Sequence, residues 1–121
     1  MINLSSLPKT WLIDVDGTIF AHNSHLTGED VLLPGVEIFF SMIPVEDTIL
    51  LLTARKRKYR EATLAALVRY GIRYNEVIFD LPVGERILIN DRKPSGLQTA
   101  YAINVMRDNG LGDLCRGFPE A

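Results

Sequence analysis

The sequence predicts a doubly wound parallel α/β sheet of about five strands, with helices on both of its faces. Three observations lead to this prediction: short apolar runs that barely alternate, helical repeats between them, and polar residues where the runs end. An unalternating apolar run is typical of a strand that is covered on both faces. Strands that alternate with helices along a chain favour parallel pairing in one sheet.

Five apolar runs are expected to form the strands. Four are strong, at residues 11–15, 48–52, 76–79 and 86–89, and a weaker one covers 102–105. Ile, Leu, Val and aromatic residues dominate these runs, as is usual for buried strands.

Three segments are expected to be helices, at residues 35–42, 58–70 and 95–101. The first is introduced by Pro34, which suits the start of a helix. In the second, apolar residues recur at helical spacing until Gly71 supplies a stop signal. The third is short and follows a proline.

Length and composition limit the function classes. The 121 residues suffice for one domain, residues 1–121, with a core of its own. A formal charge of −2 argues against a nucleic-acid coat or a membrane-surface module, which need excess Lys and Arg. Cys115 is the only cysteine, so a reducing compartment is the default. With no signal core and no apolar run near the ~20 residues of a membrane span, the protein is expected to be cytoplasmic.

Polar residues follow the expected strands at the edge where parallel sheets bind ligands. Asp14 and Asp16 end the first strand, Thr53 ends the second, and Asn90 and Asp91 end the fourth. Two carboxylates held together repel each other unless a cation lies between them, and oxygen ligands of this kind suit Mg²⁺. An isolated Asp-Gly pair would more often be a simple turn, but the polar residues on other strand ends favour a site.

Three segments resemble motifs of the haloacid dehalogenase (HAD) superfamily phosphatases. Residues 14–18 (Asp-Val-Asp-Gly-Thr) resemble the first motif, 51–55 (Leu-Leu-Thr-Ala-Arg) the second, and 87–91 (Ile-Leu-Ile-Asn-Asp) the fourth. The resemblance covers roughly residues 11–106 and implies a Rossmann-like fold of the HAD type. The short gaps between motifs resemble the capless branch, in which residues 19–33 would form a short flap after the first strand.

The resemblance implies a role for each acidic position. Asp14 would be the nucleophile that forms an aspartyl-phosphate, and Asp16 would protonate the leaving alcohol and later activate water. Asp91 would complete a Mg²⁺ site with Asp14 and the backbone carbonyl of Asp16. Asn90 stands where the family often has an acidic residue, and its amide oxygen can still bind the metal.

The resemblance also implies phosphate contacts. These are the Thr53 hydroxyl and the backbone N–H near Gly17, and Arg55 is expected at the rim of the pocket. The family's third motif, a cation ahead of the fourth-motif strand, is harder to place. Arg86 is favoured because it directly precedes that strand, and Arg55 and Lys93 are the other candidates.

The function expected from these residues is that of a Mg²⁺-dependent phosphatase, a phosphomonoester hydrolase that acts through an aspartyl-phosphate. A sugar phosphate or a surface-polysaccharide precursor is the expected substrate. The alternative is a catalytically retired HAD-like module that binds a partner or a sugar phosphate. A phosphoacceptor signalling domain fits less well, because its phosphorylated Asp ends a middle strand rather than the first one.

The expected partners are a small or larger phosphate ester and a second copy of the chain, without nucleic acid and without a membrane. A site that lacks a cap must exclude water by its flap, by a neighbouring subunit or by a large substrate. His22 and His25 fall in the flap and are expected to be surface residues rather than a metal pair.

Overall fold

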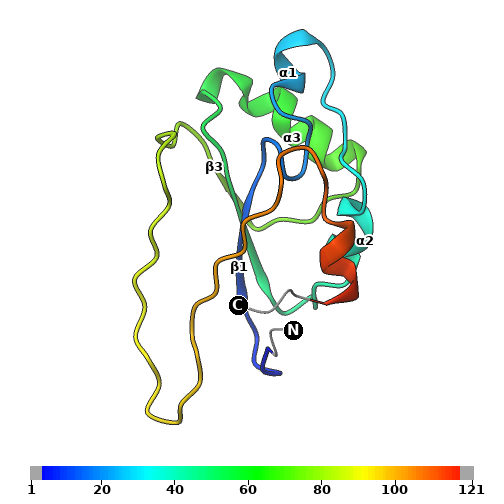
Figure 1. Ribbon diagram of the computed structural model, residues 1–121. Coiled ribbons are helices and arrows are strands. Elements are labelled where there is room, and N and C mark those ends of the chain that lie inside the picture. The colour runs from blue at the N-terminus through cyan, green and yellow to red at the C-terminus, as the bar shows by residue number, and fades with distance from the viewer. Residues whose placement is uncertain (1–3, 118–121) are drawn as a thin grey trace.

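A computed structural model describes residues 4–117 of the chain and shows a small α/β fold (Figure 1). Its sheet has three parallel strands in the order β1-β2-β3, namely β1 (Thr10–Asp14), β2 (Thr48–Leu52) and β3 (Glu76–Ile78). The register pairs Asp14 with Leu52 at the carboxyl end of β1. The first three expected strands, at residues 11–15, 48–52 and 76–79, are therefore confirmed.

Two longer helices accompany this sheet. They are α2 (Val36–Ser41) and α3 (Arg60–Arg69), and α3 is preceded by the 3₁₀ turn η1 (Arg57–Tyr59). Both match expected helices. Two shorter pieces were not expected: α1 (Ser24–Thr27), which lies in the flap, and the 3₁₀ turn η2 (Gly112–Arg116) near the C-terminal end.

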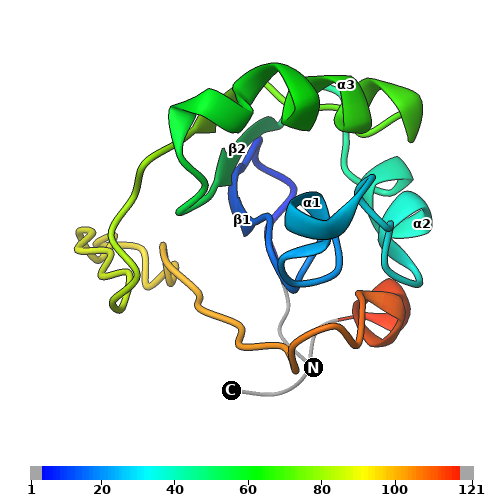
Figure 2. The same ribbon diagram turned by 90° about the horizontal axis from the view of Figure 1, so that it is seen from above.

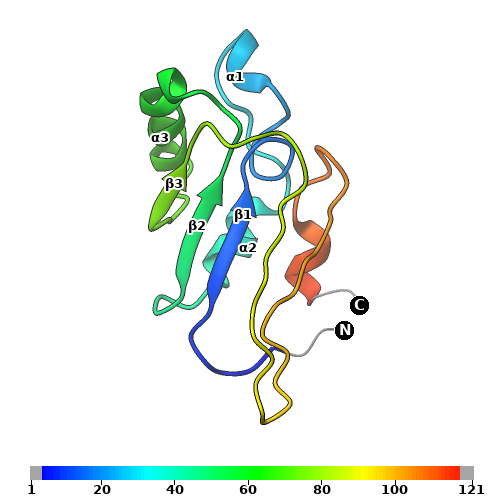
Figure 3. The same ribbon diagram turned by 90° about the vertical axis from the view of Figure 1, so that its left-hand side faces the viewer.

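The helices cover one face of the sheet. Burial alternates along β2, where Ile49 and Leu51 are fully buried, and Leu12 and Ile78 on the neighbouring strands are 47% and 38% exposed. Figure 3 looks onto the less covered face, with α2 and α3 lying behind the strands, and Figure 2 shows the same arrangement from above. The expectation of a sheet covered on both faces is not met within residues 4–117.

Residues 81–105 correct three expectations. The runs at 86–89 and 102–105 are not strands, and 95–101 is not a helix. The segment is instead a long loop whose two limbs lie side by side beyond β1 (Figures 1 and 3). Ile87 and Ile89 are 82% and 90% exposed. Apolar composition alone cannot show which strand a run pairs with. Within residues 4–117, β1 pairs only with β2 and forms one edge of the sheet.

After this loop the chain returns to the body and packs η2 against α2. The approach is close at Gly35, which has φ of +76°, because a Cβ there would overlap the backbone nitrogen of Gly112. The amide of Leu111 donates to the carbonyl of Pro34 at 2.9 Å. The body thus closes around a core that includes β1, β2 and α2.

Within residues 4–117 no helix has the length and apolar character needed to cross a membrane.

Candidate active site

Asp14 lies at the carboxyl end of β1 with its side chain 37% exposed. Thr18 Oγ1 donates to Asp14 Oδ2 at 3.2 Å, and Arg86 Nη1 donates to Asp14 Oδ1 at 2.7 Å. The chain turns sharply between Asp14 and Thr18 because Gly17 adopts a φ of +81°. The nucleophile candidate is thus oriented by two donors and remains open to solvent.

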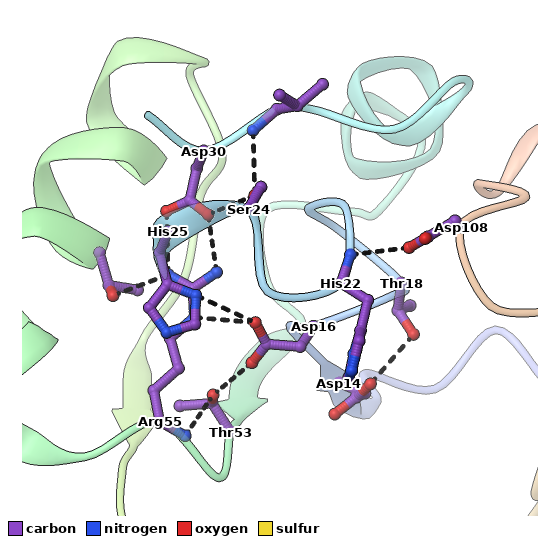
Figure 4. Close-up of polar contacts among 12 residues, drawn as sticks. Asp14, Asp16, Thr18, His22, Ser24, His25, Asp30, Thr53, Arg55 and Asp108 are labelled. Atoms are coloured by element: carbon purple, nitrogen blue, oxygen red, sulfur yellow. Dashed lines mark hydrogen bonds and ion pairs between the residues drawn. The ribbon is translucent and has the colours of Figure 1, made fainter. Parts of the chain in front are cut away.

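Asp16 follows the strand and faces a different set of donors (Figure 4). Thr53 Oγ1 donates to its Oδ2 at 2.8 Å, and Arg55 Nε donates to its Oδ1 at 3.0 Å. Its side chain is 17% exposed. These two bonds fix the carboxylate at the edge where β1 and β2 end.

Arg55 is the buried centre of this arrangement. Its Nη1 and Nη2 donate to both oxygens of Asp30, at 2.9 and 2.7 Å, and Nη1 also donates to Thr63 Oγ1 at 3.0 Å. Burial is the largest single influence on the pKa of Arg55 and lowers it, but Asp30 and Asp16 together raise this pKa above its usual value. The guanidinium therefore stays charged and joins the flap to the end of β1.

Asp30 is held from several sides. The Ser24 hydroxyl donates to its Oδ1 at 2.9 Å, and the Tyr70 hydroxyl donates to its backbone carbonyl at 2.9 Å. Burial has the largest effect on the pKa of Asp30 and raises it, but the bonds and charge of Arg55 and the bond from Ser24 lower it below its usual value. The flap is therefore tied both to the site and to the end of α3.

His25 is not a surface residue, contrary to expectation. Its side chain is only 9% exposed, and its ring packs edge-on against Tyr59 at 4.8 Å between centroids. His25 Nδ1 lies 3.8 Å from Asp16 Oδ1 and has no hydrogen-bond partner among the described residues. Burial and then the charge of Arg55 lower the pKa of His25, against the opposite effect of Asp16 and Asp30.

The residues expected to contact phosphate are more buried than expected or already hydrogen-bonded within the protein. Arg55 is buried under the site rather than exposed at its rim, and Thr53 is fully buried with its hydroxyl on Asp16. The Gly17 amide donates to the carbonyl of Phe20 at 2.7 Å. Of the three candidates for the third-motif cation, Arg86 is the one that the structure brings to Asp14. The phosphate-binding roles themselves stay predictions.

The expected magnesium ligands do not come together. Asp14 and Asp16 each accept a hydrogen bond from an arginine, and the described part of the chain has no group of three or more His, Cys, Asp or Glu that could hold a metal. Asn90 and Asp91 lie in the loop 81–105, where the Asn90 amide donates to the carbonyl of Thr99 at 3.2 Å. The described arrangement therefore does not fit a magnesium site.

Two supporting residues escaped the sequence analysis. Asp30 is a buried ion-pair partner, but in the sequence it is one of several polar residues of a flap, and nothing there marks it as buried. Arg107 packs its Cγ 3.1 Å from the position that a Cβ on Gly17 would take. Only the folding back of residues 105–111 brings Arg107 there, and no local pattern predicts this return.

No protein-family model and no curated protein matches the chain. Two solved chains do, one from the structure of the Pnkp1/Rnl/Hen1 complex and one from that of the Pnkp1/Rnl/Hen1 RNA repair complex. The first aligns with 69% of this chain, at 28% sequence identity and a TM-score of 0.53. The second aligns with 65% of this chain, at 28% sequence identity and a TM-score of 0.52. This chain spans only 31% and 28% of their lengths.

This likeness corrects the expected partners. The partners expected from the sequence are a phosphate ester and a second copy of the chain, without nucleic acid. Both similar chains come from an assembly of several proteins, and one of the two structures is described as an RNA repair complex. The expectation that excluded nucleic acid is therefore overturned.

Proposed function

We propose that this chain is a phosphomonoester hydrolase of the HAD type that uses Asp14 as its nucleophile. The observation that carries the proposal is the setting of Asp14, which is solvent-accessible at the end of β1 and oriented by Thr18 and Arg86. In folds with a parallel sheet, ligands bind beyond the carboxyl ends of the strands, which is where Asp14 lies. The order of the three motifs along the chain supports the same assignment.

The chemistry divides into two displacements. An Asp14 oxygen bonds to phosphorus while the ester P–O bond breaks, and the leaving oxygen takes the proton of Asp16 in its protonated, carboxylic acid form. A water then attacks the same phosphorus, gives a proton to Asp16 and frees inorganic phosphate together with the Asp14 carboxylate. Thr53 and Arg55 hold Asp16 in position for both proton transfers.

Arg86 supplies positive charge beside the reacting centre. Its Nη1 is 2.7 Å from Asp14 Oδ1, and both side chains are more than a third exposed. An incoming phosphate carries more negative charge than Asp14 and competes for this guanidinium. In the proposal Arg86 moves from the carboxylate to the phosphate, where it stabilises the charge that develops in the transition state.

The five-strand, doubly wound form of the fold is part of the proposal. The edge of β1 opposite β2 is unpaired within residues 4–117, and the exposed apolar run 86–89 would suit it. If residues 86–89 paired with this edge of β1, Asn90 and Asp91 would lie closer to Asp14. A magnesium-dependent mechanism requires these three residues to be close together. Activity that survives EDTA without loss would remove magnesium from the proposal.

The single domain and the cytoplasmic location also stay predictions.

The substrate that we propose is a phosphate ester on an RNA end, in place of the sugar phosphate expected from the sequence. The support is the likeness to chains of a complex described as acting in RNA repair. A site without a cap also suits a large substrate, because the strand itself would cover the reacting phosphate.

A retired binding module is the second candidate. It is favoured by the engagement of both carboxylates, Asp14 with Arg86 and Asp16 with Arg55. Such a module would bind a phosphorylated end without releasing phosphate.

A phosphate-release assay with and without Mg²⁺ tests the proposal, with p-nitrophenyl phosphate and an end-phosphorylated RNA as substrates. Asp14→Asn should lower kcat at least about a hundredfold, as expected when a nucleophile is lost. Asp113→Asn, the same change at an exposed position in η2, should leave it within about twofold. Activity that is indifferent to Asp14→Asn would refute the mechanism. Binding of the RNA without release would favour the retired module.

A further inference from the structure

Four exposed cations stand in a run directly after the second motif. They are Lys56, Arg57, Lys58 and Arg60, which we call the basic rim. Nearly a third of the 13 Lys and Arg residues of a chain with net charge −2 therefore lie within five positions. The preceding Arg55 is buried and neutralised by Asp30 and Asp16, so its charge is not available at the surface.

The rim is electrostatically unfavourable in the free protein. Its members repel one another, and they lie where α3 begins, which is the end at which the helix dipole disfavours positive charge. Within residues 4–117, Arg57 is the only rim cation with an ion pair, at 3.5 Å from Asp80, and its side chain is 79% exposed. A polyanion bound here would remove much of this repulsion.

Aromatic rings help to set two of the rim side chains. Lys58 Nζ lies 5.2 Å from the centre of the Tyr59 ring, and Arg60 Cζ lies 6.0 Å from that of Phe79. Such contacts stabilise a cation and leave its head group at the surface. The rim is therefore a partly ordered surface rather than a set of freely moving chains.

The rim belongs to the same edge as the candidate active site. The Arg57 amide donates to Asp80 Oδ1 at 3.1 Å, and the Asp80 amide donates to the carbonyl of Arg55 at 2.9 Å. Tyr59 packs on His25, whose ring nitrogen is 3.8 Å from Asp16. Figure 1 places the start of α3, the turn after β1 and the first part of the loop 81–105 at one end of the molecule.

We infer that the basic rim binds the sugar–phosphate backbone of a single-stranded RNA whose terminal phosphate reaches Asp14. This inference rests on the proposed function. Several cations at the same end of the molecule as the candidate active site suit a strand that carries many phosphates, and such contacts carry affinity without reading sequence.

Fluorescence anisotropy of the full chain with a short end-phosphorylated single-stranded RNA tests the inference. The variant is Lys56→Gln/Lys58→Gln/Arg60→Gln, which keeps Arg57 and its Asp80 contact. Three lost phosphate contacts should reduce the slope of log affinity against log salt by about 2 and raise Kd by about tenfold or more. The matched control carries the same charge change at exposed positions outside the rim, Arg69→Gln/Arg92→Gln/Arg116→Gln.

Hydrolysis of p-nitrophenyl phosphate separates this inference from the proposed function. The rim variant should keep kcat/KM for this small ester within about twofold, because phosphate contacts along the strand are absent from it. Equal loss of RNA affinity in the rim variant and the control would overturn the inference, and so would equal loss of activity on both substrates. Rim-dependent RNA binding without any hydrolysis would support the inference while the proposed function fails. Hydrolysis of the small ester without RNA binding would support the proposed phosphatase activity and overturn the inference about the basic rim.

Discussion

The substitution Asp30→Asn should expose how strongly the flap is tied to the site. In the folded protein the Asp30 and Arg55 side chains are 3% and 1% exposed and share two hydrogen bonds of 2.7 and 2.9 Å. Asparagine keeps one acceptor oxygen but loses the charge. Arg55 would then remain buried with Asp16 as its single anionic partner.

Removal of one member of a buried ion pair typically costs about 3–5 kcal/mol, because the other charge stays buried. Asp16 remains close to Arg55, so the lower figure of about 3 kcal/mol applies here. A domain of this length unfolds with an entropy of about 0.25 kcal/mol per kelvin, so Tm should fall by about 12 °C.

Thermal unfolding followed by circular dichroism measures this effect. Asp80→Asn is the matched control, since Asp80 is 38% exposed and pairs with an Arg57 that is 79% exposed. An exposed pair contributes about 0.5 kcal/mol, or about 2 °C. A Tm loss at Asp30 no larger than that at Asp80 would refute the view that the buried pair holds the flap.

Three further outcomes are expected. Gly35→Ala should lower Tm by at least about 4–8 °C, because the positive φ alone costs about 1–2 kcal/mol and the displacement of η2 adds to it. Gly84→Ala, with open space around it, should leave Tm nearly unchanged, and equal melting temperatures for the two variants would contradict the close packing at Gly35. Arg86→Ala should leave Tm within about 3 °C, since its ion pair is exposed, but lower kcat; unchanged kcat would remove it from the site. Because Asp30 has a lowered folded-state pKa, its stabilisation is complete above about pH 4 and is lost as the pH falls through that pKa. The Tm difference between wild type and Asp30→Asn should therefore narrow in acid, and a constant difference would contradict this.

Part of the fold follows from local sequence alone. The strands β1, β2 and β3 and the helices α2 and α3 are marked by apolar runs or helical repeats, and the structure confirms them. The run at 86–89 has a similar apolar composition but pairs with no strand in the part of the chain that the structure describes, since strand pairing depends on contacts between distant segments. The same limit explains η2, which is fixed by its packing against α2.

The site was predictable to the same degree. Asp14, Asp16 and Thr53 lie at adjacent strand ends, and parallel pairing necessarily brings such ends together. The surroundings of Arg55 were not predictable, because its partner Asp30 is 25 positions away in a polar segment. Arg55, which was expected at the rim of the pocket, is instead buried and bound to Asp30.

The anchor at Arg55 also has consequences for how the molecule fluctuates. The flap cannot detach from the end of β1 without separating the buried Asp30 and Arg55 charges. Opening of the flap should therefore cost at least about the 3 kcal/mol assigned to this pair, and backbone amides of the flap should exchange with deuterium more slowly than those of an ordinary surface loop. In the proposed function, substrate would reach Asp14 along the open side of the sheet edge, and its turnover would not require the flap to open.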